Sequence, residues 1–241
     1  MKKTKIIGVV SVKGGVGKTS VTSNLGAVLS QKFGKKVLVL DGNFSAPNLG
    51  MHLGVVDAEH NIQDVLQGKK HIFAAIHEFD EDFHFIPASI STKRVKWDSF
   101  KNKVKSLRGK YDYVLIDASP SSEIKATIDA SDSLLVVVNP DLPTVSTTVR
   151  TINLIEKNKK PILGLVLNRV NKKKYELGRK EIEETLGYNA LVSLPDDRRM
   201  MKALSKMHPY TMLYPRKRLT KKYAELGEQI TGEILKKSWL F

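Results

Sequence analysis

The sequence lacks cysteine altogether across its 241 residues. Disulfides, thiolate nucleophiles, cysteine-ligated zinc sites and iron–sulfur clusters are therefore excluded. Long apolar runs are also missing, since no stretch reaches the ~18 uncharged apolar residues that a membrane-spanning helix needs. The apolar run after the basic N-terminus ends before Lys13 and is too short for the core of a signal peptide. We therefore expect a soluble, cytoplasmic protein that is at most peripheral to a membrane.

Acidic residues are scarce relative to basic ones. The chain carries 40 Lys and Arg against 25 Asp and Glu, which gives a formal net charge of +15. An excess of this size favours a polyanionic partner such as nucleic acid or an anionic membrane face, although a solvated basic surface has the same composition. The basic residues gather in five clusters, at residues 93–96, 101–110, 172–174, 198–202 and 216–222.

Short apolar runs alternate along the chain with helical patterns. Runs rich in β-branched residues predict strands at residues 6–10, 37–40, 83–86, 113–116, 134–138, 162–167 and 190–194. Apolar stripes predict helices over residues 19–32, 144–157, 175–186 and 219–234. This order predicts an α/β fold, with a doubly wound, mostly parallel sheet of about seven or eight strands and helices on both faces. No linker or internal repeat divides the chain, so we expect residues 1–241 to form a single domain.

A glycine-rich loop follows the first predicted strand and precedes the first predicted helix. It reads Lys13, Gly14, Gly15, Val16, Gly17, Lys18, Thr19 and Ser20. Glycines let the backbone curl until its N–H groups point at phosphate oxygens, and the helix N-terminus adds partial positive charge. In such a loop Lys18 reaches the β- and γ-phosphates and the Thr19 hydroxyl holds Mg²⁺. The loop therefore predicts a P-loop that binds a nucleotide with Mg²⁺.

The loop departs from the usual P-loop pattern, whose first glycine would stand at Val12. A second lysine, Lys13, stands next to that position. The run from Lys13 to Thr19 resembles the deviant Walker A motif of the ParA/MinD family of ATPases, and the resemblance covers residues 5 to about 232. It implies ATP and Mg²⁺ as cofactors. It also implies an ATP-dependent homodimer, in which Lys13 crosses the interface to contact the phosphates bound by the partner.

The second predicted strand ends at Asp41, at the rim where open α/β sheets bind nucleotides. Asp41 and residues 48–49 and 53–54 resemble the first switch of the MinD-like branch, which implies that Asp41 helps to bind Mg²⁺ and takes part in catalysis. The second acid of that switch, which the family uses to orient or activate the attacking water, is Asn43 in this sequence. An amide hydrogen-bonds water but accepts no proton. We therefore expect Asn43 to position water, and hydrolysis to be slow.

Another predicted strand closes on Asp117 and resembles the family's Walker B strand. The residues that follow, Ala118-Ser119-Pro120, are close to the family's usual sequence but not identical. The resemblance implies that Asp117 holds Mg²⁺ through water. Glu123, six residues later, is close enough along the chain to approach the second switch, but we expect it to be a solvated loop acid.

Two strand ends resemble the family's adenine-binding elements. Asn168 and Arg169 follow one strand, and Pro195 and Asp196 follow the next. An Asn amide offers one donor and one acceptor, which suits the edge of adenine. The alternative is that these are ordinary turn residues at strand ends.

The resemblance implies a spatial switch that positions division machinery, chromosomes, plasmids or organelles with the help of an activating or cargo protein. MinD relatives bind membranes through a C-terminal amphipathic helix, whereas ParA relatives bind DNA non-specifically. Residues 235–241 mix lysines with Trp239 and Phe241, so this tail suits an anionic membrane surface or folds back on the body. The basic clusters suit non-specific DNA binding.

Two other functions remain open. One is a ParA-like, DNA-bound module that is gated by nucleotide and hydrolyses ATP negligibly. The other is a metabolic enzyme of the same fold that uses ATP to activate a substrate, for which the sequence shows no dedicated set of residues.

Overall fold

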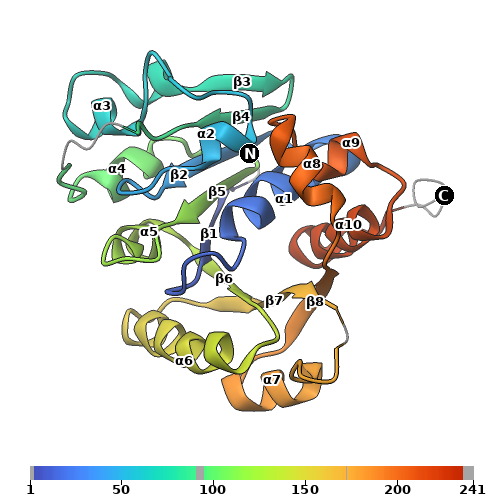
Figure 1. The fold of residues 1–241 in the computed structure, drawn as a ribbon. Helices are drawn as coiled ribbons and strands as arrows, with labels where there is room; N and C mark the ends of the chain where they lie inside the picture. Colours follow the sequence, from blue (N-terminus) through green and yellow to red (C-terminus); the bar gives the residue numbers. More distant parts are fainter. Residues whose placement is uncertain (1–2, 91–94, 172, 236–241) are drawn as a thin grey trace.

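The computed structural model describes residues 3–90, 95–171 and 173–235. Its strands form one sheet in the order β3-β4-β2-β5-β1-β6-β7-β8 (Figure 1). The strands are β1 (Lys5–Val10), β2 (Val37–Gly42), β3 (His77–Asp80), β4 (Phe83–Ile86), β5 (Tyr113–Ala118), β6 (Ser133–Val138), β7 (Ile162–Val170) and β8 (Ala190–Pro195). Neighbouring strands are parallel except β3 and β4, which are antiparallel. The predicted doubly wound, mostly parallel sheet is confirmed.

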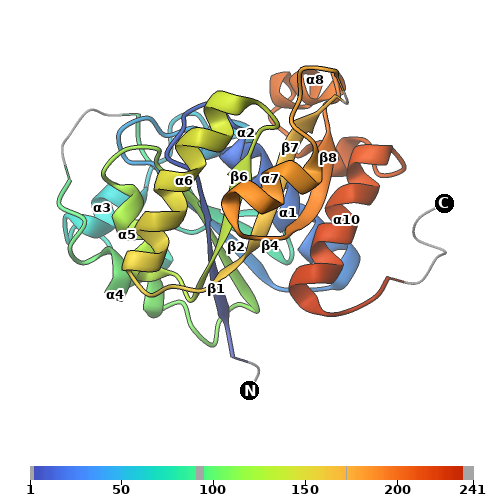
Figure 2. The ribbon, with the colours of Figure 1, turned by 90° about the horizontal axis from the view of Figure 1, so that it is seen from below.

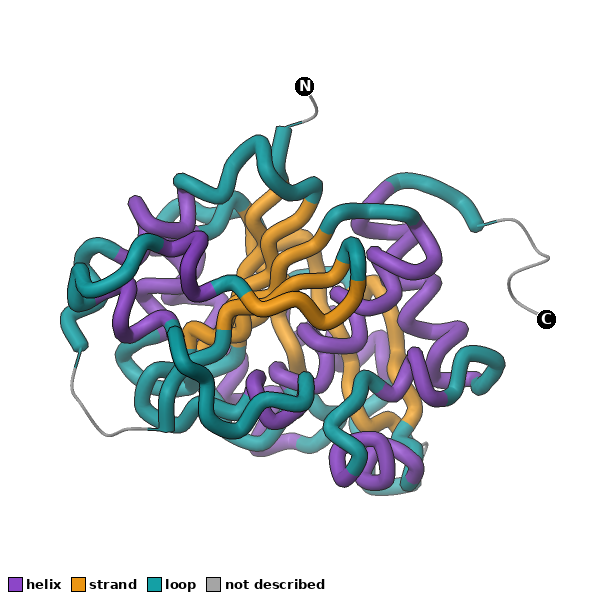
Figure 3. The backbone as a smooth tube through the Cα atoms, turned by 90° about the horizontal axis from the view of Figure 1, so that it is seen from above, coloured by secondary structure: helices purple, strands orange, loops and turns teal. Residues whose placement is uncertain are grey.

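Helices cover both faces of this twisted sheet, as Figures 2 and 3 show. On one face lie α1 (Lys18–Phe33), α2 (Leu49–His52), α8 (Arg199–Ser205), α9 (Tyr210–Leu213) and α10 (Arg218–Thr231). On the other lie α3 (Ile62–Leu66), the 3₁₀ helix η1 (Ile72–Ala75), α4 (Phe100–Lys105), α5 (Ile124–Ala130), α6 (Leu142–Lys157) and α7 (Arg179–Leu186). The strands are therefore buried on both faces, which explains their nearly continuous apolar runs.

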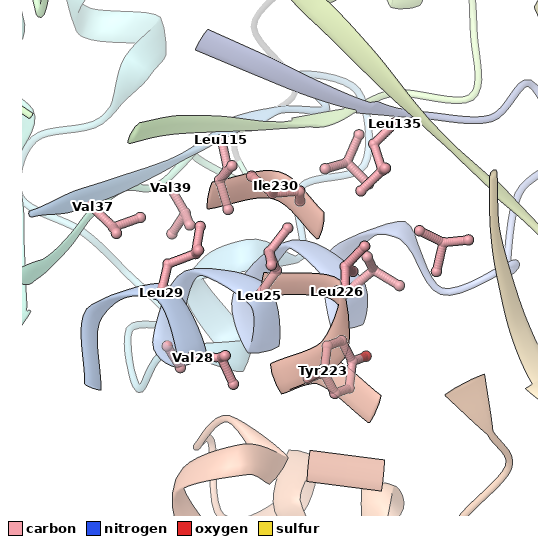
Figure 4. Packing of buried hydrophobic residues seen from close by; sticks show 14 of the residues in the cluster. Leu25, Val28, Leu29, Val37, Val39, Leu115, Leu135, Tyr223, Leu226 and Ile230 are labelled. Atoms are coloured by element: carbon pink, nitrogen blue, oxygen red, sulfur yellow. The ribbon is translucent and has the colours of Figure 1, made fainter. Parts of the chain in front are cut away.

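The core between the sheet and α1 fixes the start of that helix. Leu25 and Leu29 of α1 pack with Leu226 and Ile230 of α10 against strand residues that include Leu115 (Figure 4). All five side chains are buried. Truncating a buried leucine costs roughly 2–5 kcal/mol in other cores, so this packing holds α1 firmly against the sheet. The loop that precedes α1 is thereby held at the carboxyl end of β1.

The order of the strands places this loop at the reversal point of the sheet. In the sheet, β5 and β2 lie on one side of β1 and β6 and β7 lie on the other, and the chain crosses from the first side to the second between β5 and β6. Ligands of open α/β sheets bind outside the carboxyl ends of the strands at such a point. The fold thus brings the loops after β1, β2, β5 and β7 to one edge.

Some predicted boundaries were wrong. The edge strand β3 was missed because it is short and polar, and its residues alternate between half-buried and exposed. The helix expected at residues 175–186 begins only at Arg179, after a turn. The helix expected at residues 144–157 begins earlier, at Leu142, because Asp141 caps it by accepting a hydrogen bond from the backbone N–H of Thr144.

Several expectations concern residues that the structure does not describe. The tail at 235–241 lies outside the described residues except for Leu235, as do Lys93, Arg94 and Lys172 of the basic clusters. Among the helices that are described, none is long and apolar enough to cross a membrane.

Candidate functional site

The predicted phosphate loop joins the carboxyl end of β1 to the start of α1. Gly15 and Gly17 have φ angles of 76° and 97°, a left-handed conformation that side chains disfavour. Gly17 is needed for space as well, because a Cβ there would clash with the side-chain amide of Asn168. The loop therefore leads directly into the N-terminus of α1. The first backbone N–H groups of a helix have no partner within the helix and suit an anion.

Polar side chains from neighbouring elements brace the loop. Asn168 at the end of β7 donates from Nδ2 to the carbonyl oxygen of Val16, at 2.7 Å. Asn139, in the amide orientation that satisfies both of its groups, donates to the same oxygen at 3.1 Å. Thr151 of α6 accepts from the backbone N–H of Val12, at 3.1 Å. Sequence reasoning missed Asn139, which carries no motif of its own.

Lys18 is largely buried at the base of the loop, with 7% of its surface exposed. Its Nζ donates to the backbone carbonyl of Lys13, at 3.3 Å. Burial lowers the pKa of Lys18, and the nearby carboxylate of Asp117 acts in the opposite direction. The structure thus holds the Lys18 ammonium against the backbone of the loop, where the sequence predicted a phosphate ligand.

The predicted metal-binding groups lie together on β2, β5 and α1. The Thr19 hydroxyl donates to Oδ2 of Asp117, at 2.6 Å. The other carboxylate oxygen of Asp117, Oδ1, is buried and has no hydrogen-bond partner among the described residues. A buried oxygen without a partner is costly unless a ligand satisfies it. Mg²⁺ prefers oxygen ligands and keeps several waters, so Thr19 and Asp117 fit it.

Asp41 lies directly beside Asp117 in the parallel pair of β2 and β5. Its carboxylate accepts backbone N–H groups from Asn43 at 2.9 Å, from Asn48 at 3.2 Å and from Leu49 at 3.0 Å. Burial raises the pKa of both acids, and that of Asp41 further because Asp117 lies beside it. Asp41 therefore shapes the loop after β2, and a cation between the two acids would relieve their repulsion.

Asn43 is buried and closes a turn in this loop. Its Nδ2 donates to the carbonyl oxygen of Ala46, and its Oδ1 accepts from the Ala46 N–H at 3.3 Å. The amide makes both hydrogen bonds at once, whereas a carboxylate would accept but not donate. The residue that replaces the family's acid is thus well suited to holding this turn.

Lys13 reaches across to α6 of its own chain. Its Nζ donates to Oδ1 of Asp141 at 3.2 Å and to the Thr144 hydroxyl at 2.6 Å. The Lys13–Asp141 pair is about 40% exposed on each side, and pairs of this kind contribute at most ~1 kcal/mol. Lys13 is therefore held in place but can be released at small cost.

Glu123 is not the solvated acid that the sequence suggested. It is 7% exposed, and its carboxylate accepts hydrogen bonds from the hydroxyl and the backbone N–H of Ser45. The expectation was wrong because sequence alone did not show that the loops after β2 and β5 lie side by side.

A cavity of about 360 Å³ opens beside the start of α1. Asn168, Arg169, Pro195 and Asp196, the four residues predicted near adenine, all line it together with Ser20. Met200, Met201, Leu204 and Leu219 supply an apolar wall. The cavity suits a planar base, which binds between apolar side chains and a few oriented polar groups. Contact of these residues with adenine stays a prediction.

Comparison with known proteins identifies the family. Residues 4–165, which include the loop and both buried acids, match a family model described as an AAA domain. The chain is 31% identical to the septum site-determining protein MinD of Thermotoga maritima, over 95% of this chain and 88% of that protein.

The chain belongs to the ParA/MinD family of P-loop ATPases.

Further relatives agree with this assignment. The chain is 32% identical to an uncharacterised ATP-binding protein of Methanocaldococcus jannaschii, over 94% of this chain and 87% of that protein. The solved structure of MinD of Pyrococcus horikoshii in complex with Mg-ADP superimposes with a TM-score of 0.89 at 28% identity, covering 94% of this chain and 96% of that one. ATP and Mg²⁺, the cofactors expected from the sequence, are those of the ParA/MinD family.

Proposed function

We propose that residues 1–241 form a single ATPase domain that binds Mg-ATP, dimerises around the nucleotide and acts as a spatial-positioning switch. The observation that carries the proposal is the buried Asp117 carboxylate, which has one oxygen bonded to Thr19 and the other without a partner. It stands beside the P-loop and its buried Lys18. Together these groups offer oxygen ligands for a divalent cation and a cation for phosphate.

Each group of the chain has a separate task in this proposal. The loop amides and Lys18 bind and orient the β- and γ-phosphates, and Thr19 and Asp117 orient the metal's ligand shell. Asn43 positions the attacking water, and Lys13 leaves Asp141 to reach the partner's nucleotide. Bound Mg²⁺ supplies charge neutralisation at the phosphates. The cavity lined by Asn168 and Pro195 receives the base.

The switch acts on a surface, either DNA or the inner face of the membrane, with an activating or cargo protein as a further partner. One basic segment favours binding to a polyanion: residues 198–222 contain nine Lys and Arg and no Asp or Glu. They form α8, α9 and the start of α10, which contact one another in that order. In Figures 1 and 2 this segment lies on the opposite side of the molecule from α4. The basic clusters therefore do not share one face.

We expect the paired substitution of Arg216 and Arg218 by alanine to weaken DNA binding and to leave ATP affinity unchanged. Both side chains are exposed, and neither lines the base cavity. Each lost phosphate contact should reduce the salt dependence of binding by about one unit of the log–log slope. Fluorescence anisotropy with duplex DNA over a series of salt concentrations measures the DNA affinity and its dependence on salt.

The matched control is the paired substitution of Lys101 and Lys105 by alanine. These lysines lie on α4 and change the net charge by the same amount. Equal losses in both variants would mean that the effect is net charge alone. If anionic vesicles, and not DNA, recruit the ATP-bound protein, the surface is the membrane and the DNA assignment is wrong.

The role of Asn43 predicts a gain of activity. We expect Asn43→Asp to raise kcat about tenfold at saturating ATP, equivalent to about 1.4 kcal/mol of barrier, because a carboxylate is a stronger acceptor for the attacking water. The same change removes the donor to Ala46, so we expect about 1 kcal/mol of lost stability. An unchanged or lower kcat under saturation would move the water-positioning role to another residue.

Multiple-turnover phosphate release tests the proposed function as a whole. We expect slow release by the wild type with Mg-ATP, and faster release with duplex DNA or anionic vesicles. No turnover under any of these conditions, with ATP still bound, would favour the nucleotide-gated binding module that hydrolyses negligibly.

A further inference from the structure

A buried carboxylate joins two loops that approach the nucleotide site from different strands. Glu123, at the start of α5, accepts from the Ser45 backbone N–H at 3.3 Å and from the Ser45 hydroxyl. The two residues are 78 positions apart in the sequence. Ser45 lies in the loop after β2, which we call the first switch loop (residues 43–48). Glu123 ends the loop after β5, the second switch loop (residues 119–123).

The Glu123 end of this contact is firmly anchored. Helix α5 packs so closely on the sheet that a Cβ at Gly8 would lie 2.9 Å from a methyl carbon of Thr127, and one at Gly42 would lie 3.0 Å from the Thr127 hydroxyl. Inside the second switch loop, Ser121 accepts from the backbone N–H of Glu123 at 3.4 Å. The Glu123 carboxylate therefore stands at the start of a helix, α5, that is packed closely on the sheet.

The Ser45 end is more weakly supported. Ser45 and Ala46 are exposed, although the neighbouring Phe44 is buried and packs edge-on against Phe100 of α4. Beyond Phe44, hydrogen bonds hold the loop: the Asn43 side chain closes the turn at Ala46, and Asp41 accepts the backbone N–H groups at the two ends of the loop. Glu123 adds the one contact among these that comes from outside β2 and the loop itself. A charge-assisted bond to a buried carboxylate is stronger than a neutral one.

We propose that Glu123 is a positioning residue: through Ser45 it ties the first switch loop to the second, so that the two loops respond to bound nucleotide as one unit. This inference rests on the proposed ATP-binding function. Asn43 begins the first switch loop, and Asp117 lies just before the second. The bridge therefore fixes the distance between the group that positions water and the group that orients the metal's ligands.

Hydrogen exchange and kinetics test the bridge with four variants. Ser45→Ala and Glu123→Gln each remove part of it, the double variant removes both parts, and Ser45→Thr keeps the hydroxyl. Asp129→Asn is the matched control, because it makes the same change of charge nearby on α5, at a partly exposed side chain paired with Lys125. Amide exchange is followed in both loops without nucleotide and with a non-hydrolysable ATP analogue, and kcat and KM for ATP are measured separately.

We expect exchange in the first switch loop to be about tenfold faster in Ser45→Ala and Glu123→Gln, and its protection by the analogue to be lost while the second loop keeps its own. We expect kcat to fall about tenfold with KM changed less than twofold. The double variant should lose less than the sum of the two single effects, because Ser45→Ala leaves Glu123 only the Ser45 backbone N–H to accept. Ser45→Thr and Asp129→Asn should match the wild type.

Wild-type exchange in Ser45→Ala, or additive effects in the double variant, would overturn the bridge. The exchange readout does not depend on turnover. If the wild type hydrolyses no ATP but the exchange results are as expected, the bridge stands and the proposed ATPase function is wrong. If the analogue protects neither loop in the wild type, the inference itself is wrong.

Discussion

Lys18→Ala is expected to weaken ATP binding by about a hundredfold or more, which corresponds to about 2.7 kcal/mol. The Lys18 ammonium is buried inside the P-loop and donates to a backbone carbonyl there. Hydrogen bonds to charged groups contribute roughly 1.5–3 kcal/mol each, and a bound triphosphate offers several acceptors to this one cation. Calorimetric titration with Mg-ATP measures the loss directly.

A matched variant separates this effect from a general loss of positive charge. Lys125→Ala removes an exposed lysine of α5 that pairs only with Asp129 among the contacts of the described residues. We expect it to bind ATP like the wild type. Thermal unfolding of both variants shows whether each is folded. Unchanged ATP affinity in a folded Lys18→Ala protein would mean that the loop is not the phosphate site.

Lys13→Ala is expected to bind ATP within about threefold of the wild type but to form no ATP-dependent dimer. The structure places Lys13 on Asp141 and Thr144 of its own chain. Its proposed target lies on the partner's nucleotide. The substitution therefore leaves the chain's own phosphate site intact and removes the contact between subunits. Light scattering with saturating Mg-ATP measures the dimer, and a normal dimer in this variant would contradict the role.

Asp141→Asn tests the same lysine from the opposite direction. It weakens the contact that holds Lys13 within its own chain. Because the pair is half-exposed, its release changes the dimerisation constant by at most about fivefold, equivalent to ~1 kcal/mol. We expect a tighter dimer with ATP. A weaker one would mean that Asp141 supports the dimer rather than competing with it.

The sheet was predictable from the sequence because its strands are buried on both faces. All seven apolar runs are strands, from β1 to β8, and only β3 was missed. That strand lies at the edge of the sheet, where pairing with β4 and not burial holds it. Apart from Phe79, its residues therefore carry no apolar signal. Helix starts were harder to predict, because a single capping side chain, such as Asp141, sets where the helix begins.

The site was predictable where a motif fixes spacing along the chain, and not where the fold joins distant loops. Lys18 and Thr19 belong to one loop, so their proximity follows from the motif. The contacts of Glu123 with Ser45 and of Lys13 with Asp141 span 78 and 128 positions. Such pairs depend on the order of the strands. Neither residue type nor spacing along the chain predicts them.

The mass of the wild-type protein in solution with different nucleotides shows whether ATP drives dimerisation. Sedimentation is measured with Mg-ATP, with Mg-ADP and with ATP plus a chelator. We expect a dimer with Mg-ATP alone, which returns to monomer as phosphate is released. A protein that stays monomeric with Mg-ATP, or that dimerises equally with Mg-ADP, would contradict an ATP-driven switch.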